Sequence, residues 1–172
     1  MQNNYNKLMN NLEALGLNLF KANMGTYLNY IESNSKTVVD ALYELSEMEV
    51  GLRTERAMNA CVKVANFPFI KTLEVFDFSF QPSINKEQII NYKYLRFIEN
   101  KENIVFIGSP EVGKTHLATA IGIEAAKLRT STYFISCSDL ILQLKRAHLE
   151  NRLEQRLKFF AKYKLLIIDE VG

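Results

Sequence analysis

The feature that most constrains the fold is the segment at residues 108–115, which has the pattern G-x-x-x-x-G-K-T. A short apolar run at residues 103–107 precedes it and predicts a buried strand, and residues 116–128 predict a helix. Between a strand and a helix, such a loop holds phosphate with its backbone N–H groups and with the positive end of the helix. We call residues 108–115 the phosphate loop, and the sequence predicts a nucleotide site there.

Specific side chains of the phosphate loop have predicted roles. Lys114 can reach the outer phosphates of a nucleotide, and the hydroxyl of Thr115 can ligate Mg²⁺. His116 follows directly, and it either packs in the interior or contacts phosphate. The predicted nucleotide-binding residues are Gly108, Ser109, Pro110, Glu111, Val112, Gly113, Lys114, Thr115 and His116.

Glu111 is unusual in a loop that binds phosphate, because its carboxylate has the same charge as the ligand. Its side chain is expected to point outward. If this position needs a positive φ, glutamate is more costly there than glycine. The sequence therefore predicts weaker nucleotide binding than in a glycine variant.

Two further apolar runs complete an α/β pattern. Residues 132–136 predict a second strand, and residues 165–168 predict a third, which ends in Asp169 and Glu170. Strands that alternate with helices predict a parallel sheet covered on both faces, and the ends of its strands meet at the edge where the phosphate loop opens. Asp169 is the predicted Mg²⁺ ligand opposite Thr115, and Glu170 is predicted to polarise the attacking water. The alternative is a core strand that ends in a solvated acidic pair.

The first part of the chain is predicted to be helical, and the expected domains are residues 1–70, a helical extension, and residues 71–172, a nucleotide-binding domain. Residues 71–82 join them and carry Phe76, Phe78 and Phe80. These rings either pack at a domain seam or form a wall near the nucleotide base.

The net charge of +2 is too small to indicate a nucleic-acid partner by itself. Basic residues nevertheless outnumber acidic ones between Asp139 and Lys164, and Lys145, Arg152 and Arg156 have the spacing of one helical face. This face is either solvated without a binding role, or it is a surface that binds the phosphates of DNA without sequence preference. The sequence shows neither a signal peptide nor a long apolar run, so we expect a cytoplasmic protein with no membrane segment.

Three segments together resemble IstB, the helper ATPase of an insertion-sequence transposon family related to DnaC-type helicase loaders. They are residues 113–122, residues 71–78 and residues 165–172. The resemblance implies an AAA+ ATPase that binds ATP and Mg²⁺, assembles on DNA as a homo-oligomer and works with a transposase. It implies that Lys114 and Glu170 are catalytic, that Thr115 and Asp169 serve the metal, and that the basic stretch faces DNA.

Members of such families continue with a sensor strand and an arginine finger, whereas this sequence stops just after the predicted metal-binding strand. We therefore expect a truncated product or a fragment that hydrolyses ATP poorly. In AAA+ sheets the sensor strand lies between the strands at residues 103–107 and 165–169, so we expect either a gap there or direct pairing. The alternatives left open are a helicase loader, a GTPase, since Asp169 to Gly172 also fits D-x-x-G, and a non-catalytic remnant.

Overall fold

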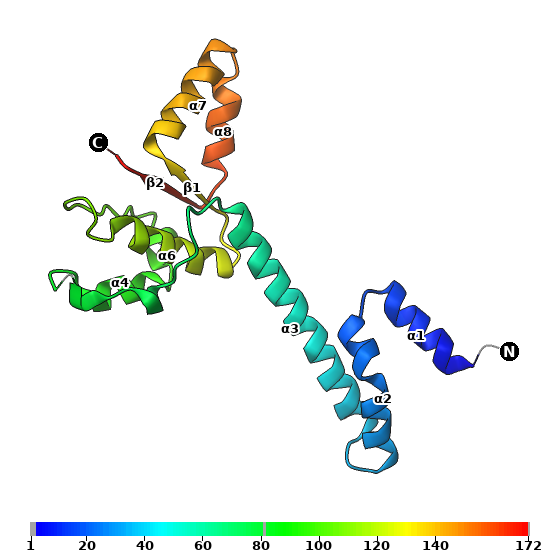
Figure 1. Cartoon of the computed structure of the whole chain (residues 1–172). Coiled ribbons are helices and arrows are strands. Elements are labelled where there is room, and N and C mark those ends of the chain that lie inside the picture. The colour runs from blue at the N-terminus through cyan, green and yellow to red at the C-terminus, as the bar shows by residue number, and fades with distance from the viewer. Residues whose placement is uncertain (1–2, 81, 172) are drawn as a thin grey trace. The chain divides into compact units, whose positions relative to one another are not determined.

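The computed structural model describes residues 3–80 and 82–171 (Figure 1). Contacts divide the chain into two compact units, residues 3–57 and 58–171, and the division falls inside helix α3 (Val38–Val64). The predicted domain boundary between residues 70 and 71 lies later in the chain and stays a prediction. Gly172, which belongs to one of the segments that resemble IstB, lies outside the described residues.

The first unit is helical, as predicted. It contains α1 (Asn4–Ala14), α2 (Asn18–Glu32) and most of α3, with a small core around Tyr27 and Leu45. Glu49 is buried, and its carboxylate accepts hydrogen bonds from the backbone N–H groups of Leu19 (2.5 Å) and Phe20 (3.0 Å). A carboxylate from α3 thus satisfies N–H groups at the start of α2 that the helix itself leaves free. No helix in the described ranges is long and apolar enough to cross a bilayer.

The second unit is built on a parallel sheet of two strands, which confirms the predicted α/β class with a partial parallel sheet. β1 (Thr132–Ser136) pairs with β2 (Leu165–Asp169) in a register that runs from Thr132 opposite Leu165 to Ser136 opposite Asp169. Helix α6 (Lys114–Lys127) packs on both strands (Figure 1). The register places Asp169 at the end of the sheet, and α6 carries the phosphate loop at its N-terminus.

The prediction of a strand at residues 103–107 is wrong, because this segment forms no strand. Its side chains alternate as in a strand, since Ile104 and Phe106 pack on the core while Val105 and Ile107 are 76% and 92% exposed. However, no described residue makes a backbone hydrogen bond to this segment, and β2 pairs with β1 alone. The sequence left two outcomes open, a gap in the sheet or direct pairing of residues 103–107 with residues 165–169. Direct pairing does not occur. An apolar alternating run indicates which side chains turn inward, but a strand also needs a neighbour.

The segment between α3 and the phosphate loop is largely irregular. It contains two 3₁₀ turns, Leu73–Val75 and Phe78–Phe80, and the short helices α4 (Lys86–Tyr92) and α5 (Arg96–Glu99). Asn85, one of the residue types preferred at a helix N-cap, caps α4 by accepting a hydrogen bond from the N–H of Gln88 (3.0 Å). Leu95 separates α4 from α5, because its φ of 58° does not fit a right-handed helix.

Helices α7 (Cys137–Leu149) and α8 (Leu153–Ala161) form a hairpin that follows β1 (Figure 1). Ser136 caps α7 by accepting a hydrogen bond from the N–H of Asp139 at 3.1 Å. A left-handed Asn151, with a φ of 53°, separates the two helices. Lys145 therefore lies on α7, whereas Arg152 and Arg156 belong to α8 and its cap. The single helical face predicted for these three residues is wrong.

Gly122 lies where α6 packs closely against side chains of β2 and of Phe67. A Cβ atom there would lie 2.5 Å from Cδ1 of Ile167 and 2.7 Å from the ring of Phe67, whereas one at Gly51 in α3 would meet nothing within 4 Å. Both glycines are inside helices, so alanine gains about 1 kcal/mol of helix propensity at either position. Overpacking opposes this gain at Gly122 by about 1–3 kcal/mol. We expect Gly51→Ala to raise the free energy of unfolding in urea and Gly122→Ala not to; equal gains would contradict the close packing.

Candidate functional site

The phosphate loop has the backbone of an anion-binding site. Glu111 and Gly113 have φ angles of 63° and 91°, and α6 begins at Lys114. Among the described residues, the backbone N–H groups from Glu111 to His116 donate no hydrogen bond. Successive free N–H groups at a helix N-terminus, in a backbone that alternates between left- and right-handed regions, form a concavity that binds anions. The loop is therefore open to a phosphate.

Glu111 adopts the left-handed conformation that was considered from the sequence, and its side chain is exposed. This conformation costs a non-glycine residue about 1–2 kcal/mol. Its carboxylate also adds a negative charge to a loop that is shaped for an anion. Both effects come from the side chain, and two substitutions can separate them.

We expect Glu111→Gln to raise ATP affinity about three- to tenfold, because two like charges about 4 Å apart in water repel each other by about 1 kcal/mol. Glu111→Gly also removes the backbone strain, so we expect it to raise the free energy of unfolding in addition. Calorimetric titration with ATP and urea unfolding measure the two quantities. Equal ATP affinities for all three chains would contradict the charge effect.

The side chain of Lys114 is folded back onto the loop. Its Nζ donates hydrogen bonds to the backbone oxygens of Gly108 (2.9 Å) and Ser109 (2.6 Å). These carbonyls hold the ammonium at the mouth of the loop, beside the free N–H groups. A phosphate that enters the loop would meet a positive charge already in place.

The predicted metal-binding pair is brought together. The hydroxyl of Thr115, in the first turn of α6, donates to the Asp169 carboxylate, with oxygen distances of 3.1 Å and 2.9 Å. Hydroxyl and carboxylate oxygens are ligands that Mg²⁺ prefers, so this donor set fits the ion. The described residues contain no group of three or more His, Cys, Asp and Glu placed to hold a metal. Other ligands would therefore come from water and from nucleotide phosphates, as is usual for Mg²⁺.

Glu170 directly follows Asp169 and is exposed. Its φ of 57° turns the chain sharply as it leaves β2. The sheet thus ends in two consecutive carboxylates, of which only Asp169 contacts the start of α6.

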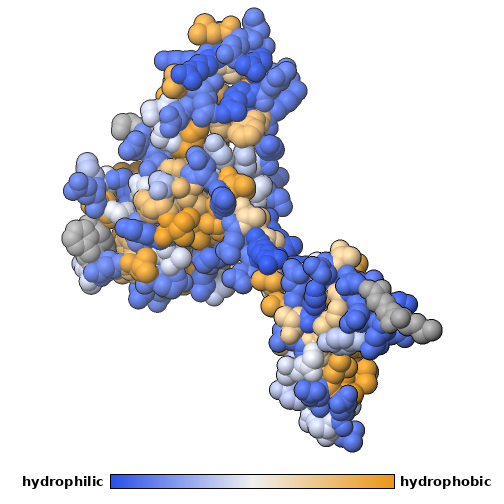
Figure 2. Space-filling model, turned by 45° about the vertical axis from the view of Figure 1, so that its right-hand side comes forward, coloured by the Kyte–Doolittle hydropathy of each residue, from blue (hydrophilic) through white to orange (hydrophobic). Residues whose placement is uncertain are grey.

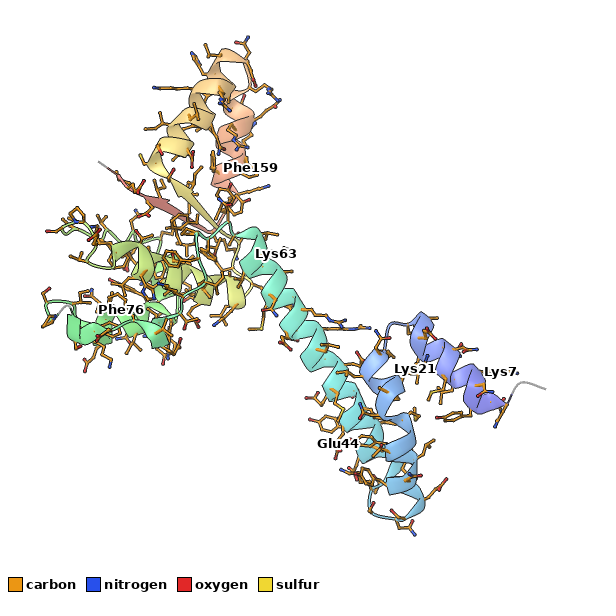
Figure 3. All side chains as sticks on the ribbon, in the orientation of Figure 1. Lys7, Lys21, Glu44, Lys63, Phe76 and Phe159 are labelled. Atoms are coloured by element: carbon orange, nitrogen blue, oxygen red, sulfur yellow. The ribbon has the colours of Figure 1, made fainter. Side chains whose placement is uncertain are left out.

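A layer of aromatic side chains lies behind the phosphate loop. A Cβ atom on Gly113 would lie 2.7 Å from the ring of Phe76, which Figure 3 labels in the region of α4 and α6. His116 packs edge-on against Phe76 and Phe69, and its Nε2 lies 3.1 Å from the backbone oxygen of Thr72. His116 thus connects α6 to the preceding segment, and its contact with phosphate stays a prediction. Packing was one of the two interpretations of His116 from the sequence, but the sequence did not identify Phe76 and Phe69 as its partners.

Phe76 and Phe78 belong to the core cluster that contains Leu73 and Leu117. Neither ring lines the cavity of about 450 Å³ that adjoins the loop. That cavity has apolar walls that include Ile84 and Phe106, and it has polar groups on Gln88 and Tyr92. These two phenylalanines thus pack within the second unit and not at a seam between the units. A wall near the nucleotide base stays a prediction. The side chain of Phe80 lies outside the described part of the structure.

Comparisons with known proteins show which family the chain is similar to. A family model described as IstB-like ATP binding protein matches residues 10–172. The ATP-binding protein named for insertion sequence IS232 of Bacillus thuringiensis subsp. berliner is 52% identical over 172 residues, which is 100% of this chain and 69% of that protein. The one named for IS5376 of Geobacillus stearothermophilus is 41% identical over 83% of this chain and 57% of its own length.

A third relative, the ATP-binding protein named for IS21 of Pseudomonas aeruginosa, is 42% identical over 70% of this chain. The match covers 45% of that relative. The chain therefore corresponds to between about half and about two thirds of the relatives' lengths.

Proposed function

Because the chain belongs to the family of IstB-like ATP-binding proteins, we propose that it uses ATP to assemble on DNA and to assist a transposase. The observation that carries this proposal is the contact between Thr115 and Asp169, which lie 54 residues apart in the sequence. It joins the phosphate loop to the end of β2. A phosphate site and a metal site are then adjacent, as an enzyme that acts on a nucleoside triphosphate requires.

The proposed nucleotide is ATP, with its phosphates in the loop and its base and sugar in the adjoining cavity. Residues 108–116 would bind the phosphates mainly through free backbone N–H groups, and Lys114 would contact the outer ones. All three relatives described above are named as ATP-binding proteins. Their names favour ATP over the GTP alternative.

The proposed reaction is hydrolysis of the terminal phosphate. Mg²⁺, held by Thr115 and Asp169, would neutralise charge on the phosphates. Glu170 would accept a proton from the attacking water, and Lys114 would stabilise negative charge on the terminal phosphate. Only Lys114 and Thr115 are fixed by α6, whereas both carboxylates come from the end of β2.

The proposed partners are DNA, a transposase and further copies of this chain. The relatives' names place those proteins with insertion sequences, and this supports a role in transposition. Basic residues on and around α7 and α8 support binding to DNA phosphates. They are Lys145, Arg146, Arg152, Arg156, Lys158, Lys162 and Lys164. A protein with these partners would act in the cytoplasm.

Two titrations test the proposal. Calorimetry with ATP and GTP, each with and without Mg²⁺, is expected to show a preference for ATP and tighter binding with the metal. Fluorescence anisotropy with duplex DNA is expected to show tighter binding when ATP is present. If no nucleotide binds, the proposed nucleotide site is overturned. If ATP does not change the affinity for DNA, the proposed ATP-dependent assembly on DNA is overturned.

A further inference from the structure

Residues 67–76 run beside α6 toward the phosphate loop, and we call them the aromatic strap. A Cβ atom on Gly122 would lie 2.7 Å from the ring of Phe67, and one on Gly113 would lie 2.7 Å from the ring of Phe76. Gly122 is inside α6, whereas Gly113 directly precedes it. The strap therefore contacts the body of the helix near its own start and the back of the phosphate loop near its end.

The strap is anchored to the sheet just before it begins. The N–H of Phe134 in β1 donates a hydrogen bond to the backbone oxygen of Ala65 (2.8 Å), and the side-chain amide of Asn66 donates one to the backbone oxygen of Phe134 (3.0 Å). Because this end is fixed to β1, the rest of the strap has a defined starting point from which it can hold the loop.

One side of the strap faces the core and the other faces solvent. Leu73 is buried in a core cluster with Leu117 of α6, whereas Ile70 and Val75 are 62% and 65% exposed. Figure 2 shows that hydrophobic residues do reach the surface of this unit. The strap is thus a single layer of chain that lies between the start of α6 and water.

His116, in the first turn of α6, contacts the middle of the strap. Its Nε2 lies 3.1 Å from the backbone oxygen of Thr72, and its ring packs edge-on against Phe69 and Phe76, with centroids 6.2 Å and 5.1 Å away. A carbonyl oxygen only accepts hydrogen bonds, so Nε2 of His116 carries the hydrogen and donates it. The strap therefore occupies the side chain of His116 and leaves its backbone N–H available to a phosphate.

The phosphate loop needs support from outside, because its own residues do not favour its shape. Glu111 has a φ of 63°, which is unfavourable for a residue with a Cβ atom. The backbone N–H groups from Glu111 to His116 donate no hydrogen bond to any described residue. A strained backbone of this kind persists only where the surrounding structure holds it in place.

We propose that the aromatic strap holds the phosphate loop in the shape that binds nucleotide, and that His116 and Phe76 are positioning residues. Phe76 supports Gly113 from behind, and His116 ties the start of α6 to Thr72. If the loop has this shape for only part of the time, its apparent affinity for a nucleotide falls in proportion. The inference rests on the proposed ATP binding. It adds two side chains that raise ATP affinity without touching the nucleotide.

Two substitutions of His116 test the hydrogen bond to Thr72, by calorimetric titration of the whole chain with ATP and Mg²⁺. His116→Leu removes the donor, so we expect ATP to bind about three- to tenfold more weakly, the effect of one hydrogen bond. His116→Gln keeps an N–H donor at a similar reach and should retain most of the affinity. Equal losses in the two variants, or no loss in His116→Leu, would overturn the role of this hydrogen bond.

A pair of ring deletions tests the support from Phe76. Phe76→Leu and Phe160→Leu each remove an aromatic ring from the second unit, and Phe160 is buried in α8. Both should lower the free energy of unfolding in urea, since both leave unfilled space. Only Phe76→Leu should also weaken ATP binding. If the two variants bind ATP with the same affinity, Phe76 has no positioning role.

¹⁵N NMR distinguishes positioning by His116 from direct contact with phosphate. The chain contains two histidines, His116 and His148, so His148→Gln leaves one imidazole ring to observe. We expect an N–H on Nε2 that exchanges slowly with water, both without nucleotide and with ATP bound. A scalar coupling between this N–H and ³¹P of the nucleotide would overturn the positioning role, while the ATP site would stand. If the unaltered chain does not bind ATP, both proposals are overturned.

Discussion

Replacing Lys114 with methionine is expected to weaken ATP binding by about ten- to a hundredfold, because charged hydrogen bonds contribute about 1.5–3 kcal/mol. The side chain keeps its length and loses its ammonium group, which is now held at the loop mouth by the oxygens of Gly108 and Ser109. Those two carbonyls belong to exposed residues and can bind water instead. The fold should therefore tolerate the change.

Calorimetric titration with ATP measures the effect, and thermal unfolding without nucleotide checks the fold. Lys127→Met is a matched control at the other end of α6, where Lys127 pairs with Glu124 at 2.8 Å. The control should bind ATP like the unaltered chain. Similar losses in both variants would show that the ammonium group of Lys114 has no special role.

Replacing Glu170 with glutamine is expected to slow hydrolysis of bound ATP by about 10²- to 10⁴-fold, which is the usual contribution of a general base. ATP affinity should change little, because Glu170 is exposed and follows the strand that carries the metal ligand. Asp169→Asn is expected to behave differently, since it weakens the contact proposed to hold Mg²⁺ and should reduce the gain in ATP affinity that the ion provides.

Single-turnover measurement of ATP hydrolysis separates the two carboxylates. Glu102→Gln serves as a control for loss of an exposed carboxylate from another part of the same unit. Unchanged hydrolysis in Glu170→Gln would remove this residue from the proposed mechanism. Loss of ATP affinity in the same variant would assign Glu170 to nucleotide binding.

The strands at residues 132–136 and 165–169 could be predicted because their signal is local. Both runs are rich in apolar residues, and the acidic pair after the second run has the spacing of a metal-binding strand. The helix after the phosphate loop could be predicted for the same reason. In each case the deciding residues are adjacent in the sequence.

The predictions that failed, and the contacts that were not predicted, involve residues that lie far apart in the sequence. Residues 103–107 have the composition of a strand, but the described structure supplies no neighbouring strand for them. Arg146 and Arg156 line one cavity only because a left-handed Asn151 ends one helix and permits another. The contact of Phe76 with Gly113 depends on how an irregular segment folds back. Local patterns do not encode such contacts.

Within the described part of the chain, the backbone of residues 103–107 has no hydrogen-bond partner, and this has a consequence for amide hydrogen exchange. Amides in the ladder between β1 and β2 exchange only when the sheet opens, whereas amides without hydrogen-bond partners need no opening. The slowly exchanging core of this unit therefore stops short of the segment that leads into the phosphate loop. Slower deuterium uptake at the amides of Ile104 and Phe106 would show that a bound nucleotide or partner chain orders that segment. Uptake at the amides of β1, which should not change, serves as the reference.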